Sequence, residues 1–169
     1  MLLHREISIL PLILAVAAAC PGSPATVHAK CSMEVSFVES CDIVKEEIKA
    51  RIAGENSWVD PHNSGNYKLQ AENGNLVEGS RLTGDGKYTD LFDFAFFESD
   101  KTGCLLVACS ESQVTSVLDY STNYCNLHNL YCNSEDACPI FKSDLHYMES
   151  ATSCWQRKKE LCKSQKSEK

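Results

Sequence analysis

The sequence contains none of the short motifs that mark nucleotide-dependent or acyl-transfer enzymes. It has no Gly-x-Ser-x-Gly nucleophile elbow, no phosphate-binding P-loop and no dinucleotide-binding fingerprint. Positive charge is scarce as well, because 16 Lys and Arg residues stand against 23 Asp and Glu residues and the net charge is −7. An acidic chain argues against nucleic acid or an anionic membrane as the main partner. After residue 20, no apolar run reaches the length of about 20 residues that a membrane span needs.

Metal-binding spacings are also missing. The closest cluster, residues 125–138 with the pattern C-x2-H-x3-C-x5-C, lacks the paired C-x2-C or H-x3-H spacing of zinc sites. Residues 60–65 resemble the start of a calcium loop, but the twelfth position is Ala71, where a bidentate glutamate is needed. We therefore predict no metal ion and no other cofactor.

The N-terminus carries a candidate export signal. Arg5 provides a short positive start, residues 7–19 are almost wholly apolar, and small residues follow. This order is typical of a signal peptide, and the apolar run is too short for a membrane span. We predict a signal peptide over residues 1–25, with cleavage between 19 and 29. The protein is then secreted, either to the extracellular space or to the lumen of the secretory pathway.

Ten cysteines fit this compartment, because thiols exposed to an oxidising environment form disulfides. Cleavage after Ala19 would retain Cys20, whereas cleavage after Gly22, Ala25 or Ala29 would remove it. The other nine cysteines, all predicted to form disulfides, are Cys31, Cys41, Cys104, Cys109, Cys125, Cys132, Cys138, Cys154 and Cys162. Nine is an odd number, which in a secreted protein implies a free thiol or a disulfide-linked dimer. The sequence leaves both choices open.

The remainder of the chain predicts one domain. Residues 30–165 suffice for a single hydrophobic core, and a hydrophobic fraction of 43% is typical of a globular protein. We predict a single disulfide-stabilised α+β domain over 30–165, followed by a basic tail at 166–169.

The first element is predicted as a helix. Apolar residues recur every three or four positions from Met33 to Ile52, which is one stripe of a helix with a period of 3.6 residues. Gly54 is a natural stop. Cys41 lies on the apolar stripe, so its disulfide should join this helix to the element on which it packs.

The middle of the chain predicts an antiparallel sheet. Phe92, Phe94 and Phe96 alternate in a way that places them on one face of a strand, and residues 104–109 are apolar on both faces, as in a central strand. Residues 114–120 are expected to form the last strand. Because Cys104 and Cys109 point to opposite faces about 16 Å apart, they cannot pair with each other.

The C-terminal stretch is predicted as helical, with Ser143 as the N-cap and an apolar side running from Leu145 to Cys162. The predicted fold is therefore α+β: an N-terminal helix packed on a four- to five-stranded antiparallel sheet, with a cysteine-rich C-terminal helical segment, stapled by disulfides.

Four residues of one loop are the best ligand-binding candidates: Trp58, Asp60, His62 and Asn63. They follow the predicted helix, and functional residues concentrate on loops. The sequence supports no catalytic assignment.

Two functions remain open. The favoured hypothesis is a non-enzymatic module that binds an extracellular protein or a small-molecule ligand on its sheet or loops. The alternative is a small secreted hydrolase whose acid pair or Cys-His site is assembled from distant positions. An apolar pocket containing Asp60 and His62 would favour the enzyme, and a filled core with a surface groove would favour the binding module.

Overall fold

The computed structural model of the protein describes residues 20–163, apart from the side chains of residues 151 and 152. Residues 1–19 of the predicted signal peptide and the predicted basic tail at 166–169 lie outside the described residues. No helix in the described part of the chain is long and apolar enough to cross a membrane.

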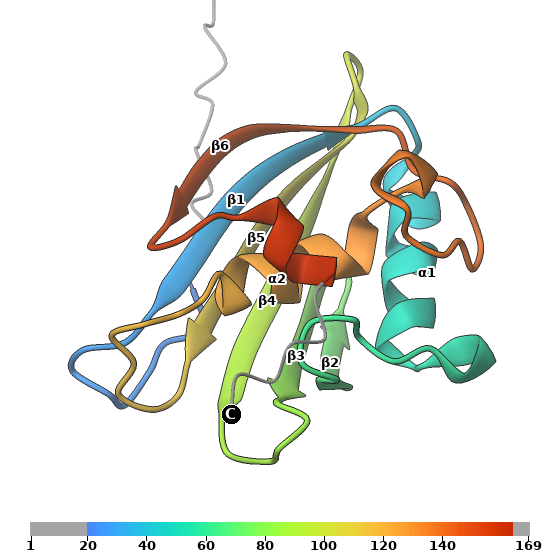
Figure 1. The fold of residues 1–169 in the computed structure, drawn as a ribbon. Helices are drawn as coiled ribbons and strands as arrows, with labels where there is room; N and C mark the ends of the chain where they lie inside the picture. The colour runs from blue at the N-terminus through green and yellow to red at the C-terminus, as the bar shows by residue number, and fades with distance from the viewer. Residues whose placement is uncertain (1–19, 164–169) are drawn as a thin grey trace, which may run out of the picture.

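The fold is built on one six-stranded sheet in which every neighbouring pair of strands is antiparallel. Its strands are β1 (Lys30–Phe37), β2 (Asn66–Asn73), β3 (Leu76–Leu82), β4 (Thr89–Ser99), β5 (Gly103–Ser112) and β6 (Tyr147–Cys154). They lie in the order β2-β3-β4-β5-β1-β6 (Figure 1). The first strand is therefore internal, and β2 and β6 form the two edges.

Both α-helices lie on the same side of this sheet, which we call the inner face (Figure 1). Helix α2 (Thr122–Tyr131) crosses β5, β1 and β4, while α1 (Cys41–Ile52) packs beside α2 near β2. Three short 3-10 turns complete the described elements: η1 (Glu55–Ser57), η2 (Ser134–Asp136) and η3 (Lys159–Lys163). Because η3 packs on α2, the latter is enclosed on both sides.

The N-terminal helix prediction is wrong for residues 33–40. Cys31, Met33, Val35 and Phe37 are buried in β1, and the residues between them point outward with the period of two that a strand requires. Met33 and Phe37 are four residues apart, a spacing that both a helix and a strand accommodate, so the apolar stripe was ambiguous here. The helix begins at Cys41, after Ser40 in an extended conformation.

The C-terminal helix prediction is also wrong. Residues 147–154 form β6, which pairs with β1 from Phe37–Tyr147 to Cys31–Cys154, and a 3-10 turn follows. Residues 114–120, predicted as a strand, form a loop. The sheet consequently has six strands instead of four or five, because both ends of the chain contribute a strand that periodicity assigned to helices.

The core fills the space between the inner face and the helices. Phe92, Phe94 and Phe96 lie in a row along β4, with neighbouring ring centroids 5.6 and 6.5 Å apart, which confirms the period-two prediction. Val44 and Ile48 of α1 are fully buried in the same cluster. Each such side chain contributes about 1.5–3 kcal/mol through burial.

Five disulfides cross-link the fold: Cys20–Cys109, Cys31–Cys154, Cys41–Cys104, Cys125–Cys162 and Cys132–Cys138. They include all ten cysteines, so no thiol is left free. Cys41 joins α1 to β5, and Cys104 and Cys109 bond to different elements, as expected. With Cys20 present the cysteine count is even, and the odd thiol that a disulfide-linked dimer would need does not arise.

Candidate functional site

The four predicted ligand-binding residues lie in the loop between η1 and β2. This loop crosses one end of α2 and reaches the buried end of β3. Asp60 and His62 are buried, whereas Trp58 and Asn63 are partly exposed. The side chains of Asp60 and Asn63 and the backbone carbonyl of His62 all contact a single cation, Arg81 of β3.

Asp60 and Arg81 form a fully buried ion pair. The Nε atom of Arg81 donates to Oδ2 of Asp60 at 2.7 Å, and Nη2 donates to Oδ1 of Asn63 at 2.8 Å and to the carbonyl oxygen of His62. The other carboxylate oxygen of Asp60 accepts bonds from the His62 amide and from Nδ2 of Asn129. The Asp60 carboxylate is bonded through both oxygens within the protein, so this network shapes the loop instead of facing a ligand. The buried Nη1 atom of Arg81 has no hydrogen-bond partner in the described part of the chain.

Gly65 fits against the same guanidinium. A Cβ atom on this residue would lie 2.2 Å from Cζ of Arg81, which is closer than side chains can approach. The absence of a side chain therefore allows the loop to close over the buried cation.

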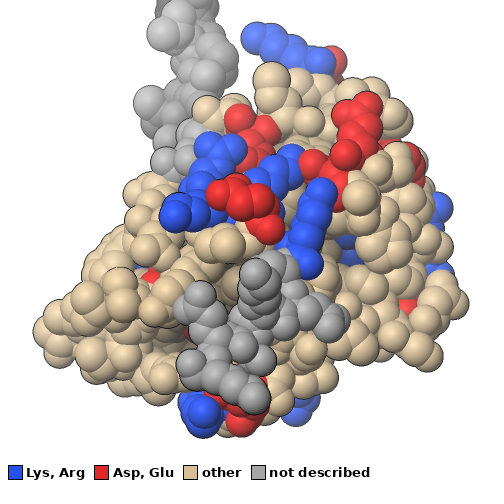
Figure 2. Space-filling model, viewed as in Figure 1, with Lys and Arg blue, Asp and Glu red and all other residues tan. Residues whose placement is uncertain are grey.

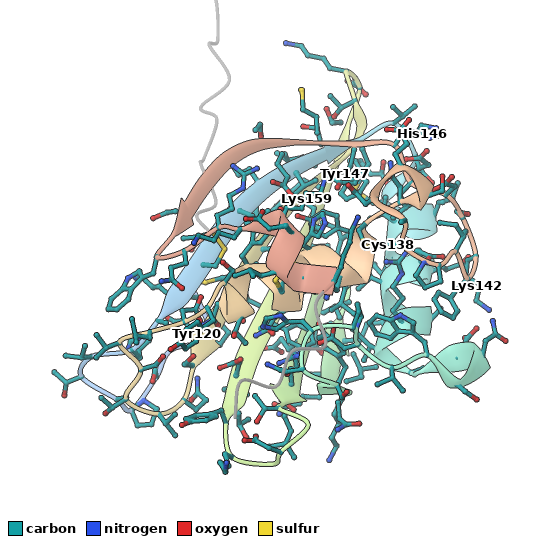
Figure 3. All side chains as sticks on the ribbon, viewed as in Figure 1. Tyr120, Cys138, Lys142, His146, Tyr147 and Lys159 are labelled. Atoms are coloured by element: carbon teal, nitrogen blue, oxygen red, sulfur yellow. A yellow bond between two sulfur atoms is a disulfide. The ribbon has the colours of Figure 1, made fainter. Side chains whose placement is uncertain are left out.

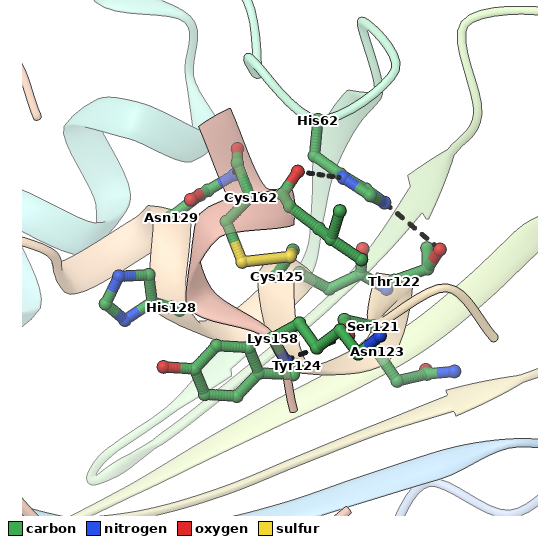
Figure 4. The surroundings of a disulfide bond; sticks show 12 residues. His62, Ser121, Thr122, Asn123, Tyr124, Cys125, His128, Asn129, Lys158 and Cys162 are labelled. Atoms are coloured by element: carbon green, nitrogen blue, oxygen red, sulfur yellow. Dashed lines mark hydrogen bonds between the residues drawn. A yellow bond between two sulfur atoms is a disulfide. The ribbon is translucent and has the colours of Figure 1, made fainter. Parts of the chain in front are cut away.

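His62 links the loop to the C-terminal segment. Its Nδ1 atom lies 3.0 Å from the carbonyl oxygen of Leu161 and its Nε2 atom lies 3.1 Å from Oγ1 of Thr122, beside the Cys125–Cys162 disulfide (Figure 4). Burial lowers the pKa of the His62 imidazole, and the nearby charge of Arg81 adds to this effect. A neutral imidazole bonded at both nitrogens is suited to hold η3 on α2.

Trp58 occupies the mouth of a small pocket. Its ring stacks on Tyr67 with centroids 5.8 Å apart and meets the edge of Phe141 at 6.3 Å. The pocket has a volume of about 190 Å³ and also borders Asp60 and Gly54. Of the four predicted residues, Trp58 and Asp60 therefore line an opening, and His62 and Asn63 do not.

A larger groove adjoins this pocket and shares Ile52 and Ala53 with it. It has a volume of about 510 Å³ and runs between α1 and the edge strand β2. Its floor is apolar, formed by Ala50, Ile52, Ala53 and Leu69, and its rim carries Glu46, Lys49, Glu55 and Lys142. We call this surface the α1–β2 groove; Lys142 on its rim is labelled in Figure 3.

Sequence reasoning missed a polar stripe on α2. Asn123, Asn126 and Asn129 recur every three residues on the helix and are all buried. Asn126 donates from Nδ2 to Oδ2 of Asp90 at 2.8 Å, and Asn123 donates to Oδ1 of Asp119 at 2.8 Å. The three-residue spacing of asparagines was visible in the sequence and indicates one helix face that seeks polar partners.

A second missed cluster surrounds His128. Its Nδ1 atom lies 3.3 Å from Oε1 of Glu149, which also accepts bonds from the hydroxyls of Tyr124 at 3.1 Å and Tyr131 at 2.9 Å. Burial alone would raise the pKa of Glu149, but the neighbouring His128, the Tyr131 hydroxyl and the Arg157 charge lower it to about 2. We find no reason to assign this closed cluster to chemistry, because His128 is 1% exposed.

The geometry bears on three kinds of site considered from the sequence: a cysteine nucleophile, a pair of catalytic acids and a metal-binding cluster. All ten thiols are bonded in disulfides, so the protein offers no cysteine nucleophile. Asp90 and Asp93, two of the acids considered for hydrolysis, lie on opposite faces of β4, as their odd separation dictates. Within residues 20–163, no group of three or more His, Cys, Asp or Glu side chains could hold a metal ion.

Charged side chains are unevenly distributed over the surface. Figure 2 shows acidic and basic side chains intermingled over the centre and top of the view, whereas the lobe at the lower left is almost free of charge. That lobe consists of residues 20–29 and 113–121, which carry exposed Val117, Leu118 and Tyr120. We call it the apolar lobe.

Comparison with known proteins gives no relative: no family model, no curated protein and no solved structure matches the chain.

Proposed function

We propose that the protein is a secreted, non-enzymatic binding module that holds an extended peptide segment of an extracellular partner in the α1–β2 groove. The observation that carries this proposal is the position of the groove along an edge strand. Within the described residues β2 is hydrogen-bonded to β3 on one side only, so its other side presents backbone donors and acceptors beside an apolar floor. An extended peptide can add to such an edge as a further strand.

The shape of the site favours a peptide over a small molecule. Small-ligand sites bury most of their ligand, whereas this groove is open to solvent, with exposed Leu69 in its floor and exposed Lys142 on its rim. Its rim carries two acidic and two basic side chains, of which Lys142 and Glu55 pair at 2.8 Å and Lys49 pairs with Glu72 at 2.5 Å. A partner with alternating apolar and charged side chains would complement both floor and rim.

The rigid frame supports the same function. Cys41–Cys104 fixes α1 to β5, and Lys45 donates to the carbonyl oxygen of Gly74 at the β2–β3 turn at 2.9 Å. Both walls of the groove are thus fixed before any partner arrives, which reduces the ordering cost of association.

The test is selection of a random dodecapeptide library on the native, oxidised protein. We expect selected peptides to bind with micromolar affinity and to protect β2 backbone amides from hydrogen exchange. The variant Ala53→Arg places a large cation in the groove at an exposed position and should weaken binding at least about tenfold.

The matched control is Val117→Asp, which places a charge on the exposed apolar lobe and should leave peptide binding unchanged. Equal affinity of the wild type and Ala53→Arg would contradict the proposal, as would protection confined to β6. Failure of peptides, with saturable binding of a small molecule that Ala53→Arg abolishes, would assign the groove to a small ligand instead.

A further inference from the structure

The first described residues are integral to the fold. Cys20 is bonded to Cys109 of β5, the amide of Gly22 donates to Oε2 of Glu111 at 2.6 Å, and the Ser23 hydroxyl donates to the carbonyl oxygen of Ser112 at 2.8 Å. These residues pack on the outer face of the sheet, opposite the helices. Cleavage of a leader after Gly22, Ala25 or Ala29 would remove Cys20 and leave Cys109 without its partner.

An unusual carboxylate lies beside this segment. Asp93 points to the outer face of β4, directly opposite Glu78 of β3 on one side and Cys109 of β5 on the other. Its side chain is buried, with 8% of the residue exposed, and its Oδ1 atom has no hydrogen-bond partner in the described part of the chain. A buried carboxylate is costly unless a donor or a cation compensates it.

The neighbouring charges do not compensate Asp93. Glu78 and Glu111 are acidic, and His28, on the segment that precedes β1, lies 3.3 Å from Glu111. No ion pair to Asp93 is found within residues 20–163. Burial, with help from Glu78 and Glu111, raises the pKa of Asp93 to about 7.

We propose that the leader is cleaved between Ala19 and Cys20 and that the α-ammonium group released on Cys20 becomes the counter-ion of Asp93. The Cα atoms of Cys20 and Cys109 are 5.2 Å apart, and Asp93 stands directly across from Cys109. The Cα atoms of directly opposed residues are about 4.5–5.5 Å apart, so the Cα atoms of Cys20 and Asp93 are at most about 11 Å apart. The Asp93 side chain points to the outer face, on which Cys20 lies, so the carboxylate and the ammonium group can approach each other there.

The cleavage is a hydrolysis by a leader peptidase of the export pathway. The bond between the Ala19 carbonyl carbon and the Cys20 nitrogen breaks, water supplies hydroxide to the carbonyl and a proton to the nitrogen, and the new amine takes up a second proton. Ala17 and Ala19 provide the small residues that such peptidases require. This inference is independent of the α1–β2 groove.

The first experiment is N-terminal sequencing and intact mass of the secreted, non-reduced protein. We expect a chain that begins at Cys20 and is ten hydrogen masses lighter than its reduced form. A chain that begins at residue 23, 26 or 30, or one that retains the leader, would overturn the proposal.

The second experiment measures the pH dependence of α-amine labelling. A nearby carboxylate raises the α-amine pKa above its usual range of about 7.7–8.0. Asp93→Asn should therefore lower this pKa and accelerate labelling at pH 7 at least threefold. Asp100→Asn, in the exposed β4–β5 turn, is the matched control and should change nothing.

A third measurement separates the ion pair from the cleavage. A neutral Gly-Ser-Gly-Ser extension ahead of Cys20 moves the ammonium group away from Asp93. Asp93→Asn should then stabilise the extended chain at pH 8, where the uncompensated carboxylate is ionised, and should not stabilise the chain that begins at Cys20. The same stabilisation in both chains, or no change in labelling, would refute the ion pair.

Discussion

Arg81 shows how a buried charge can organise a loop. Its guanidinium is fully buried and bonds to Asp60, Asn63 and the His62 carbonyl, which lie far from it in sequence. Most of the predicted ligand-binding residues therefore stabilise the loop beside the pocket. Trp58, which lies on their outer side at the pocket, is the member still available to a partner.

Removing this cation should be costly. We expect Arg81→Met to reduce the free energy of unfolding by about 3–5 kcal/mol, because it leaves the Asp60 carboxylate buried without its partner. Urea unfolding at pH 7 measures the change. Lys87→Met, which removes an exposed ion pair with Asp85, is the control and should cost far less, because exposed ion pairs contribute little to stability. Similar losses for the two variants would contradict this interpretation.

The lowered pKa of Glu149 predicts that the protein loses stability in acid. Its pKa is lowered to about 2 in the folded protein, compared with 4.5 for a free glutamate carboxyl. The stabilisation is therefore fully present above pH 4.5 and is lost as the pH falls from about 4.5 to about 2, by an amount on the order of 3 kcal/mol. Unfolding midpoints measured across this range should fall steeply for the wild type.

The variant Glu149→Gln tests the assignment. It removes the titrating group, so the slope between pH 4.5 and 2 should become shallower even though stability at pH 7 falls. Glu98→Gln changes an exposed carboxylate outside this cluster; it is the control and should preserve the wild-type slope. An unchanged slope in Glu149→Gln would assign the acid sensitivity to other groups.

At the scale of elements, the disulfides differ in what they constrain. Cys132–Cys138 closes a loop with a sequence separation of 6, whereas Cys125–Cys162 spans 37 residues and joins α2 to η3. On a chain-entropy account, replacing the longer bridge by two serines should cost about 1.5 kcal/mol more than replacing the shorter one. Thermal unfolding of both double variants provides the comparison, and the reverse order would rule out loop closure as the main effect.

Helices and strands were predictable from the sequence where the spacing of apolar residues fitted only one period, either two residues for a strand or 3.6 residues for a helix. The phenylalanines of β4 alternate over a long stretch, and their strand was predicted correctly. The stripe that begins at Met33 fitted a helix in its second half and a strand in its first, because Met33 and Phe37 satisfy either period. Residues 147–154 were assigned to a helix because their strand depends on pairing with β1, which local periodicity does not report.

The site was less predictable than the fold. The α1–β2 groove joins residues 46–55 with Leu69 and Lys142, and nothing in the spacing of these residues along the chain indicates that they meet. The partner of each cysteine was equally hidden, since connectivity is a property of the fold. The asparagine stripe of α2 was readable in principle, because its three-residue spacing is local.

At the scale of the whole molecule, the apolar lobe exposes hydrophobic side chains to water. Val117 and Leu118 are 66% and 63% exposed and lie in a region almost free of charge (Figure 2). We expect Val117→Ser combined with Leu118→Ser to reduce binding of a hydrophobic fluorescent dye and to change the unfolding free energy by less than about 0.5 kcal/mol. Unchanged dye binding would show that the lobe is not the main apolar surface.

The internal position of β1 has a consequence for biogenesis. Lys30–Phe37 is made early, yet its neighbours in the sheet are β5 and β6, and Cys31 bonds to Cys154, 123 residues later. Until the end of the polypeptide has been made, Cys31 has no native partner, whereas Cys41, Cys104 and Cys109 are already available to form non-native disulfides with it. Maturation therefore requires an isomerase, or enough reducing capacity, to undo premature sulfur pairings once synthesis is complete.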